Sequence, residues 1–143
     1  MVLKFLAVAL AGVFAGAALY VSLVEHPARM STGTAPALRE FGPSYHRGAW
    51  MQASLAILGS LAALLDYSQE HERGYLWGGL LLAAPVVYTL VVILPTNRRL
   101  LAPDLPADGP EAAALLRRWG HLHWVRTGLG MAAFGLLLRS ILT

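Results

Sequence analysis

The stretch LKFLAVALAGVFAGAALYVSLV, from Leu3 to Val24, decides the fold class of this chain. It carries one charge, Lys4 near its start, and shows no alternation of polar and apolar residues. About 20 helical residues cross a hydrocarbon core of about 30 Å. Because backbone groups in lipid must pair within their own segment, the stretch predicts a transmembrane helix and not a barrel strand. The part up to Ala17 has the form of a signal peptide, but the apolar run continues beyond it, so we expect a retained helix.

Three further apolar stretches have the same character: Gly48 to Leu65, Tyr75 to Leu94 and Leu122 to Leu142. The whole chain is 57% hydrophobic and 13% charged, with a mean hydropathy of +0.56. This composition is far from that of a soluble domain. The sequence therefore predicts one all-α domain, a four-helix transmembrane bundle, with helices of residues 3–25, 46–66, 74–95 and 119–142. We expect close helix packing at Gly12, Gly16, Gly128 and Gly130.

The connections between these helices are unequal in length. Residues 25–47 and 95–121 are predicted to form two long polar loops on one face, whereas Asp66 to Gly74 form a short solvated turn. Within the second loop, Pro110 and Glu111 predict the start of a short amphipathic helix that leads into the last membrane helix. Most of the 11 Lys and Arg residues lie in or beside the two loops. The positive-inside rule then predicts that both loops are cytoplasmic and both termini outside, in the inner membrane of a bacterium. Since basic loops have this ordinary cause, we expect no nucleic-acid partner.

The lack of cysteine excludes disulfides, thiolate ligands and cysteine nucleophiles.

Two stretches echo each other along the chain. A helix ends in HPARM, from His26 to Met30, and another ends in LPTNRRL, from Leu94 to Leu100, and each leads to a group of aromatic, His and Arg residues. This pattern hints at an internal duplication.

Pro27 is expected to break or bend the first helix, and Pro85 to kink the third. Five arginines are interpreted as topology and headgroup residues: Arg29, Arg39, Arg99, Arg117 and Arg118.

Polar side chains gather at the loop end of every predicted helix. On the last helix, Trp119, His123 and Arg126 follow the i, i+4, i+7 spacing of one face. The first helix ends in Glu25 and His26. The other two helices contribute Tyr45, Arg47, Gln52, Tyr88, Asn97 and Arg98 at the same end. Because ionisable groups in membrane segments usually mark function, the pattern predicts a shared site, with a structural salt-bridge network and an interfacial aromatic belt as alternatives.

Four stretches together resemble the anthrone oxygenase-like family of small four-helix membrane proteins. They are EHPAR at residues 25–29, PSYHRGAWMQA at 43–53, LPTNRRL at 94–100 and RRWGHLHWVRT at 117–127. The resemblance implies oxidation of anthrones to anthraquinones by dioxygen, without a metal or flavin. The residues that match the family's pattern are Glu25, His26, Pro27, Arg29, Tyr45, Arg47, Gln52, Pro95, Asn97, Arg98, Trp119, His123 and Arg126.

The first functional hypothesis is a cofactor-independent oxygenase of a lipophilic anthrone-, phenol- or quinol-like substrate, with the lipid bilayer, that substrate and dioxygen as its partners. His123 or His26 would be the general base. Arg126 or Arg98, with Asn97, would stabilise the enolate oxygen. We group Glu25 with these catalytic residues. Substrate binding is assigned to Tyr45, Arg47, Gln52, Tyr88, Asn97, Arg98 and Trp119, of which the aromatic residues would stack on the substrate rings.

Two other hypotheses remain open at this point. In one, His26, His46, His123 and Glu25 hold a metal ion or contribute to a haem site, although no two His residues have the i, i+4 spacing of a helical metal site. In the other, the chain is a carrier without catalysis, and its arginines bind the anionic group of a lipid-soluble ligand. Under the oxygenase hypothesis, no residue is assigned as a metal ligand.

Overall fold

The computed structural model describes residues 1–142, and every regular element in that range is helical. The elements are α1 (Val2–Tyr20), the π-helical turn η1 (Val21–Glu25), α2 (His26–Ser31), α3 (Thr34–Glu70), α4 (Arg73–Tyr88), the π-helical turn η2 (Thr89–Ile93), α5 (Leu94–Leu100) and α6 (Pro110–Leu142). They join into four rods that are long and apolar enough to cross a membrane, residues 2–31, 34–70, 73–100 and 110–142. The predicted four-helix bundle is therefore confirmed.

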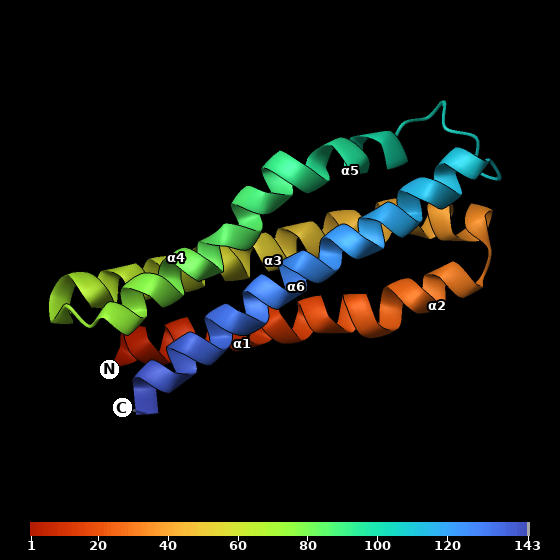
Figure 1. Cartoon of the computed structure of the whole chain (residues 1–143). Coiled ribbons are helices and arrows are strands. Elements are labelled where there is room, and N and C mark those ends of the chain that lie inside the picture. Colours follow the sequence, from red (N-terminus) through yellow and green to blue (C-terminus); the bar gives the residue numbers. More distant parts are fainter. Residues whose placement is uncertain (143) are drawn as a thin grey trace.

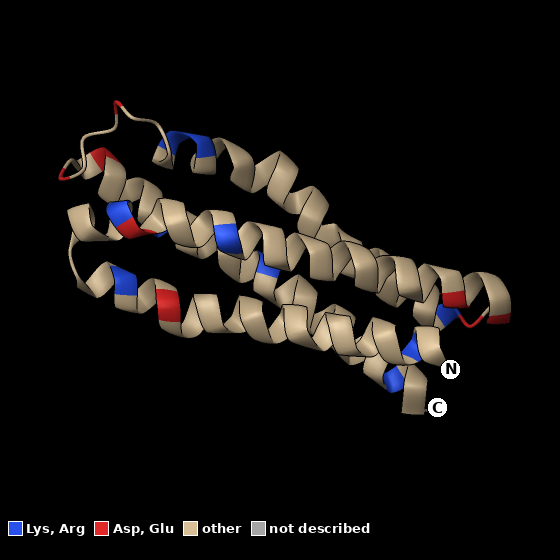
Figure 2. Cartoon of the chain, turned by 180° about the vertical axis from the view of Figure 1, so that it is seen from behind, with Lys and Arg blue, Asp and Glu red and all other residues tan. Residues whose placement is uncertain are grey.

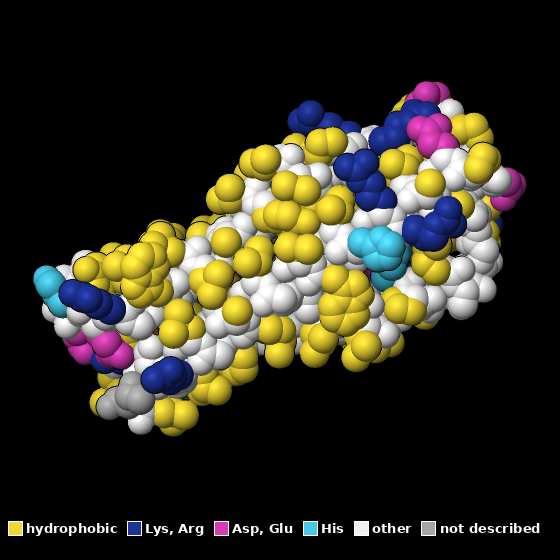
Figure 3. Space-filling model, in the orientation of Figure 1, with side chains coloured by type: hydrophobic (Ala, Val, Ile, Leu, Met, Phe, Trp, Pro, Cys, Tyr) yellow, Lys and Arg dark blue, Asp and Glu magenta, His cyan; other side chains and the backbone are white. Residues whose placement is uncertain are grey.

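The four rods form a ring of neighbours. Helix α1 packs against α3 and α6, and α4 packs against the same two helices, so α1 and α4 lie across the bundle from each other. Both termini lie at one end of the bundle, and at the other end the α4–α5 rod bends away from its neighbours (Figure 1). Most of the Lys, Arg, Asp and Glu residues lie toward the two ends (Figure 2). Hydrophobic side chains dominate the middle of the face seen in Figure 3, as lipid contact requires.

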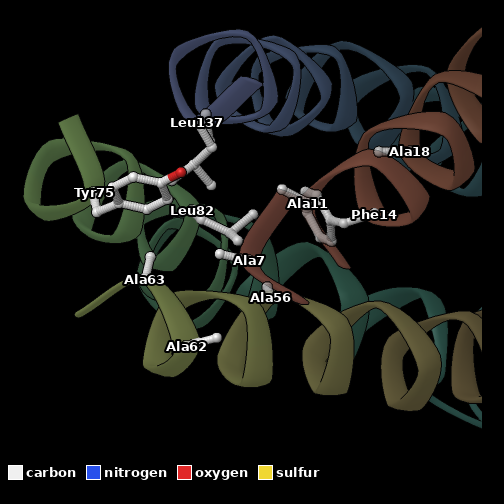
Figure 4. Close-up of a cluster of buried hydrophobic side chains, with 11 residues drawn as sticks. Ala7, Ala11, Phe14, Ala18, Ala56, Ala62, Ala63, Tyr75, Leu82 and Leu137 are labelled. Carbon is white, nitrogen blue, oxygen red and sulfur yellow. The ribbon is translucent and has the colours of Figure 1, made fainter. Parts of the chain in front are cut away.

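The core near the termini is built mainly of small side chains. Figure 4 shows this cluster, in which alanines of α1 and α3 surround Phe14, Tyr75, Leu82 and Leu137. Small residues let helix backbones approach closely in a membrane, where packing replaces the hydrophobic effect between helices. A second cluster, which includes Phe41, Ile93, Leu116 and Trp119, lies at the far end and borders the site described below. The end of the bundle near the termini is thus packed mainly with small side chains, and the end near the site is packed with larger side chains.

The four glycines predicted at close contacts divide into two pairs. A Cβ on Gly130 would lie 2.5 Å from Cε1 of Phe14, and one on Gly12 would lie 3.0 Å from Cε2 of Phe134, so the prediction is confirmed there. A Cβ on Gly16 or Gly128 would meet no atom within 4 Å, so the prediction is wrong for this pair. Spacing along one helix does not say which glycine faces a neighbouring helix.

The two predicted long loops are mostly helical, which is a correction for residues 25–47 and 95–100, whereas the helix predicted from Glu111 onward is confirmed as the start of α6. Within residues 25–47 only Thr32 and Gly33 interrupt the helices, and within residues 95–121 only residues 101–109 do so. Gly33 makes the first turn with a φ of +95°, a conformation that favours glycine. Pro110 begins α6, where a proline is tolerated because it lacks only an N–H that has no partner in the helix. The polar residues of these segments therefore lie on helices that extend beyond the apolar spans.

The loop at residues 101–109 is held by Arg99. Its guanidinium pairs with Asp104 at 3.0 Å and with Glu111 at 2.6 Å, and so joins the end of α5 to the start of α6. This guanidinium also lowers the pKa of the exposed Asp104 carboxyl. At the opposite end, Lys4 pairs with Glu70 at 2.7 Å and with Glu72 at 3.1 Å. Asp66, which was predicted in a solvated turn, belongs to α3 and is buried.

Proline shapes the two rods that contain the echoed stretches. Pro27 does not break its helix as predicted, because η1 precedes it and Pro27 falls in the first turn of α2. Pro95 occupies the same place in α5, directly after η2. The third rod bends in Figure 1 around η2, which follows Pro85, as the predicted kink required. The HPARM and LPTNRRL stretches thus share a local architecture, a π-helical turn followed by a proline-initiated helix.

Candidate functional site

A cavity of about 210 Å³ lies in the half of the bundle away from the termini. All four rods contribute to its wall, with the largest share from α3 and further residues from η1, α2, α4, η2, α5 and α6. An apolar cavity of about 150 Å³ holds benzene in another protein, so this cavity has room for a larger ring system. Seven of the predicted site residues line it: Glu25, Tyr45, Gln52, Asn97, Trp119, His123 and Arg126.

Helix α6 supplies the most deeply buried polar wall. The spacing of Trp119, His123 and Arg126 places all three on the buried face, where each is 9% exposed or less. The Trp119 ring stacks on His123 with 4.8 Å between centroids and 27° between planes. The Trp119 Nε1–H donates to Asn97 Oδ1 at 2.9 Å. This bond fixes the Asn97 amide so that its Nδ2 donors point elsewhere.

His123 is tied to the first rod through hydroxyl groups. Its Nδ1 lies 2.8 Å from Ser22 Oγ, and Ser22 Oγ lies 2.8 Å from Thr127 Oγ1. Thr127 in turn contacts the carbonyl oxygens of Ala18 and His123, both at 3.1 Å. All three side chains are buried. His123 is therefore held through Nδ1, and Nε2 is the ring nitrogen left for a ligand.

The cavity wall contains polar atoms that no protein group satisfies. Arg126 is buried and forms no ion pair with an acidic side chain in residues 1–142; its guanidinium lies 5.4 Å from the Phe14 ring centroid. Its Nε has no hydrogen-bond partner, and neither do Asn97 Nδ2, Arg29 Nη1 and Gln52 Oε1. Buried polar groups are nearly always paired, so the three nitrogen donors indicate a ligand with oxygen acceptors, and Gln52 Oε1 indicates that the ligand also carries a hydrogen-bond donor.

Arg29 is the main residue whose place the sequence analysis misjudged. It was interpreted as a headgroup residue, but only 3% of its side chain is exposed and it lines the cavity. It pairs with Glu25 and with Glu40, and donates from Nη2 to Ser44 Oγ at 2.6 Å. The i, i+4 spacing to Glu25 was the signal that could have indicated this network. Glu40 and Ser44 come from α3, and one sequence cannot reveal that contact.

Four of the predicted site residues do not line the cavity. His26 is buried behind Trp119, with 5.1 Å between ring centroids, and a Cβ on Gly120 would lie 2.6 Å from its Nε2. Tyr88 lies along a shallow apolar groove with residues of α4, η2 and α6. Arg47 and Arg98 are exposed.

The residues of the metal hypothesis are dispersed. His46 is exposed, whereas His26 and His123 are buried on different elements. Among residues 1–142, no three His, Cys, Asp or Glu side chains come together as ligands of one metal ion. Conversely, sequence analysis missed three residues of the site that carry no charge of their own. Phe41 and Thr127 are buried, and Ser44 is half-buried.

Comparison with known proteins supplies the family. Residues 41–136 match the family model described as anthrone oxygenase, and this segment covers well over half of the chain, with every cavity residue of α3 and α6 inside it. Glu25 and Arg29 precede the matched segment. Searches of curated proteins and of solved structures each found no match. On the family match, together with its four membrane-spanning rods, the chain belongs to the anthrone oxygenase family.

Proposed function

We propose that this protein is a membrane-embedded oxygenase that uses dioxygen to oxidise a lipophilic anthrone-, phenol- or quinol-like substrate, without a metal or flavin. Family membership supports the oxygenase-like role. The observation that carries the finer proposal is the cavity itself, in which a histidine faces unpaired cationic and amide donors within an apolar bundle. A base beside donors for a developing anion is the arrangement that enolate formation requires.

The cavity wall suits a flat aromatic molecule. Trp119 and Tyr45 bring ring faces or edges to it, and Phe41 packs edge-on against Trp119 with 5.3 Å between centroids. Leu90 and Ile93 of η2 add aliphatic surface to the wall. Aromatic side chains favour offset stacking or edge contacts with ligand rings. A substrate that dissolves in the bilayer can reach such a site without crossing water.

For an anthrone, His123 Nε2 removes one proton from the methylene carbon, which leaves an enolate whose oxygen accepts hydrogen bonds from Arg126 and Asn97. The enolate passes its electrons to dioxygen and a carbon–oxygen bond forms at the former methylene carbon. The proton held by His123 returns to the outer peroxide oxygen, and loss of water with the second methylene hydrogen leaves a new ketone. One oxygen atom of dioxygen ends in the anthraquinone and the other in water.

Glu25 and Arg29 have a supporting role in this proposal. The Arg29 guanidinium is neutralised by Glu25 and Glu40, and lies 5.9 Å from the Trp119 ring centroid. It therefore fixes the aromatic wall while one nitrogen, Nη1, stays free for the substrate. Arg126 has no such counter-charge, which makes it the stronger partner for an anionic oxygen. Of the two predicted bases, His123 and His26, the proposal takes His123, because His26 is absent from the cavity wall.

An optical spectrum and elemental analysis of detergent-purified protein, followed by oxygen uptake with an anthrone and with a quinol, test this function. The proposal requires a metal-free, colourless protein that consumes one dioxygen for each anthraquinone formed. A stoichiometric metal or a haem band would favour the metal or haem hypothesis instead. A tightly retained ligand with no oxygen uptake would favour the carrier.

We further propose that the cavity end of the bundle faces the cytoplasm of a bacterial cell and that both termini face outward, because basic residues concentrate near α2, α5 and the start of α6. The chain has no native cysteine, so single cysteines report sidedness directly. Asp108→Cys in the loop before α6 should react with an impermeant thiol reagent only after cells are opened. Ser68→Cys, near the other end, should react in intact cells. The reverse pattern would overturn this orientation.

A further inference from the structure

We infer that Ser22 and Thr127 set the tautomer of His123, so that its proton stays on Nδ1 and a lone pair on Nε2 faces the cavity. Neither hydroxyl is a catalytic residue under this inference, because neither touches the substrate. They are positioning residues that act through the imidazole. The inference rests on the proposed function for its catalytic meaning, but the tautomer itself is a property of the protein without substrate.

The direction of the hydrogen bonds follows from counting protons. Thr127 has one hydroxyl proton, and its Oγ1 lies 3.1 Å from the carbonyl oxygens of Ala18 and His123, which can only accept. Thr127 must therefore donate toward these carbonyls. Its contact with Ser22 Oγ at 2.8 Å then makes Thr127 the acceptor and Ser22 the donor. The single proton of Ser22 is thereby used.

With its proton given to Thr127, Ser22 can only accept from His123. The Nδ1 to Oγ distance of 2.8 Å requires a proton between these atoms, so it must reside on Nδ1. In a neutral imidazole the other nitrogen, Nε2, is then an acceptor. The reverse order would have Thr127 donate to Ser22 and Ser22 donate to His123. It would leave Thr127 Oγ1 facing two carbonyl oxygens with no proton between them.

The surroundings leave this chain of hydroxyls little freedom. Ser22, His123 and Thr127 are each 5% exposed or less, so water cannot easily replace a partner. The stacked Trp119 ring, 4.8 Å away, restrains the imidazole plane. Ser22 belongs to η1, and π-helical turns often occur at functional sites, where they re-aim side chains. The Thr127 bond to Ala18 anchors α6 one turn before η1 begins.

Nitrogen NMR of ¹⁵N-histidine-labelled protein without substrate tests the inference. Protonated and unprotonated ring nitrogens give separate signals, and the His123 signals among those of the five histidines are the ones lost in His123→Gln. We expect the proton on Nδ1 in the wild type and in Thr127→Ser, which keeps the hydroxyl. Thr127→Val keeps the shape but removes the hydroxyl, so Ser22 can donate to Nδ1 and the population shifts toward the Nε2–H form.

A matched control is Thr89→Val. Thr89 also lines the cavity, and its hydroxyl donates to the carbonyl of Pro85 at 2.7 Å, but no hydrogen bond joins it to His123. This variant should keep the wild-type tautomer. A wild-type His123 protonated on Nε2 would overturn the inference, even if Thr127→Val failed to fold. So would a Thr127→Val protein that kept the wild-type tautomer.

The kinetic consequence separates this inference from the proposed function. If the protein oxidises an anthrone, Thr127→Val should lower kcat, with little change in KM, by up to the about 10²- to 10⁴-fold that a general base supplies. Thr127→Ser should restore kcat. If no substrate of this class is oxidised but His123 is protonated on Nδ1, the hydroxyl chain stands and the proposed function falls. If oxidation occurs with His123 protonated on Nε2, the oxygenase function stands, but the inference and the role of Nε2 as the base both fall.

Discussion

Replacing Gly130 by alanine tests how closely α1 and α6 pack beneath the site. The new methyl group would lie 2.5 Å from Cε1 and 2.8 Å from Cδ1 of Phe14, which is fully buried and cannot simply swing into lipid. The Phe14 ring must therefore shift or the two helices must separate. Because the same ring lies against the Arg126 guanidinium, the change should also disturb the cavity wall.

The expected magnitude comes from two opposing effects. Overpacking a buried contact costs about 1–3 kcal/mol. Replacing glycine by alanine within a helix contributes about 1 kcal/mol of stability. The Gly130→Ala protein should therefore lose about 0–2 kcal/mol. Gly128→Ala is the matched control, since a Cβ there meets no atom within 4 Å and only the favourable effect remains.

Thermal unfolding followed by circular dichroism, with both variants in the same detergent, measures the difference. Gly130→Ala should melt below Gly128→Ala by about 3 °C or more, the shift expected for about 1 kcal/mol in a chain of this size. The KM for an anthrone should rise in Gly130→Ala alone. Equal melting temperatures for the two variants would refute the claim that Phe14 and Gly130 are in tight contact.

Three further changes probe the cavity itself. Arg126→Met should lower kcat/KM by about 10- to 100-fold, because a charge-assisted hydrogen bond to the enolate oxygen is lost. The control is Arg117→Met. Arg117 is an exposed residue of the same helix, so this variant should leave the rate of oxygen uptake unchanged. In Gly48→Leu the new side chain should extend into open cavity space and weaken substrate binding in a ligand titration. In the control Gly16→Leu the side chain also meets open space, but Gly16 does not line the cavity, so substrate binding should not change. Trp119→Phe should cost about 1–3 kcal/mol in thermal unfolding, because a buried amide oxygen loses its donor.

The apolar runs were sufficient to predict the four rods, since length and lack of charge are all that a membrane span requires. They could not predict how far the helices continue. Polar residues at the start of α3 have no apolar periodicity to mark them as helical, and pairs such as Arg29 with Glu40 hold them in place. The start of α6 was predictable, because Pro110 and Glu111 are typical of the beginning of a helix. The same limit explains why Arg29 was interpreted as a surface residue.

The cavity residues of α6 were predictable because that helix is regular, and a 3.6-residue period places Trp119, His123 and Arg126 on one face. The first rod is not regular. Its π-helical turn adds a residue, which rotates the rest of the rod by about 100° relative to an α-helix. His26, which follows this turn, is buried against Trp119 and does not line the cavity. No local signal in the sequence announces such a turn.

The central claim is that His123 removes a proton from a lipophilic substrate, and that the resulting anion then reacts with dioxygen. Anaerobic mixing of an anthrone with metal-free protein, followed by absorption spectroscopy, tests this claim most directly. The wild type should produce the enolate band, which then decays to anthraquinone when air is admitted, and His123→Gln should produce no band. Equal enolate formation by both proteins, or anthraquinone formed by His123→Gln at the wild-type rate, would contradict the account.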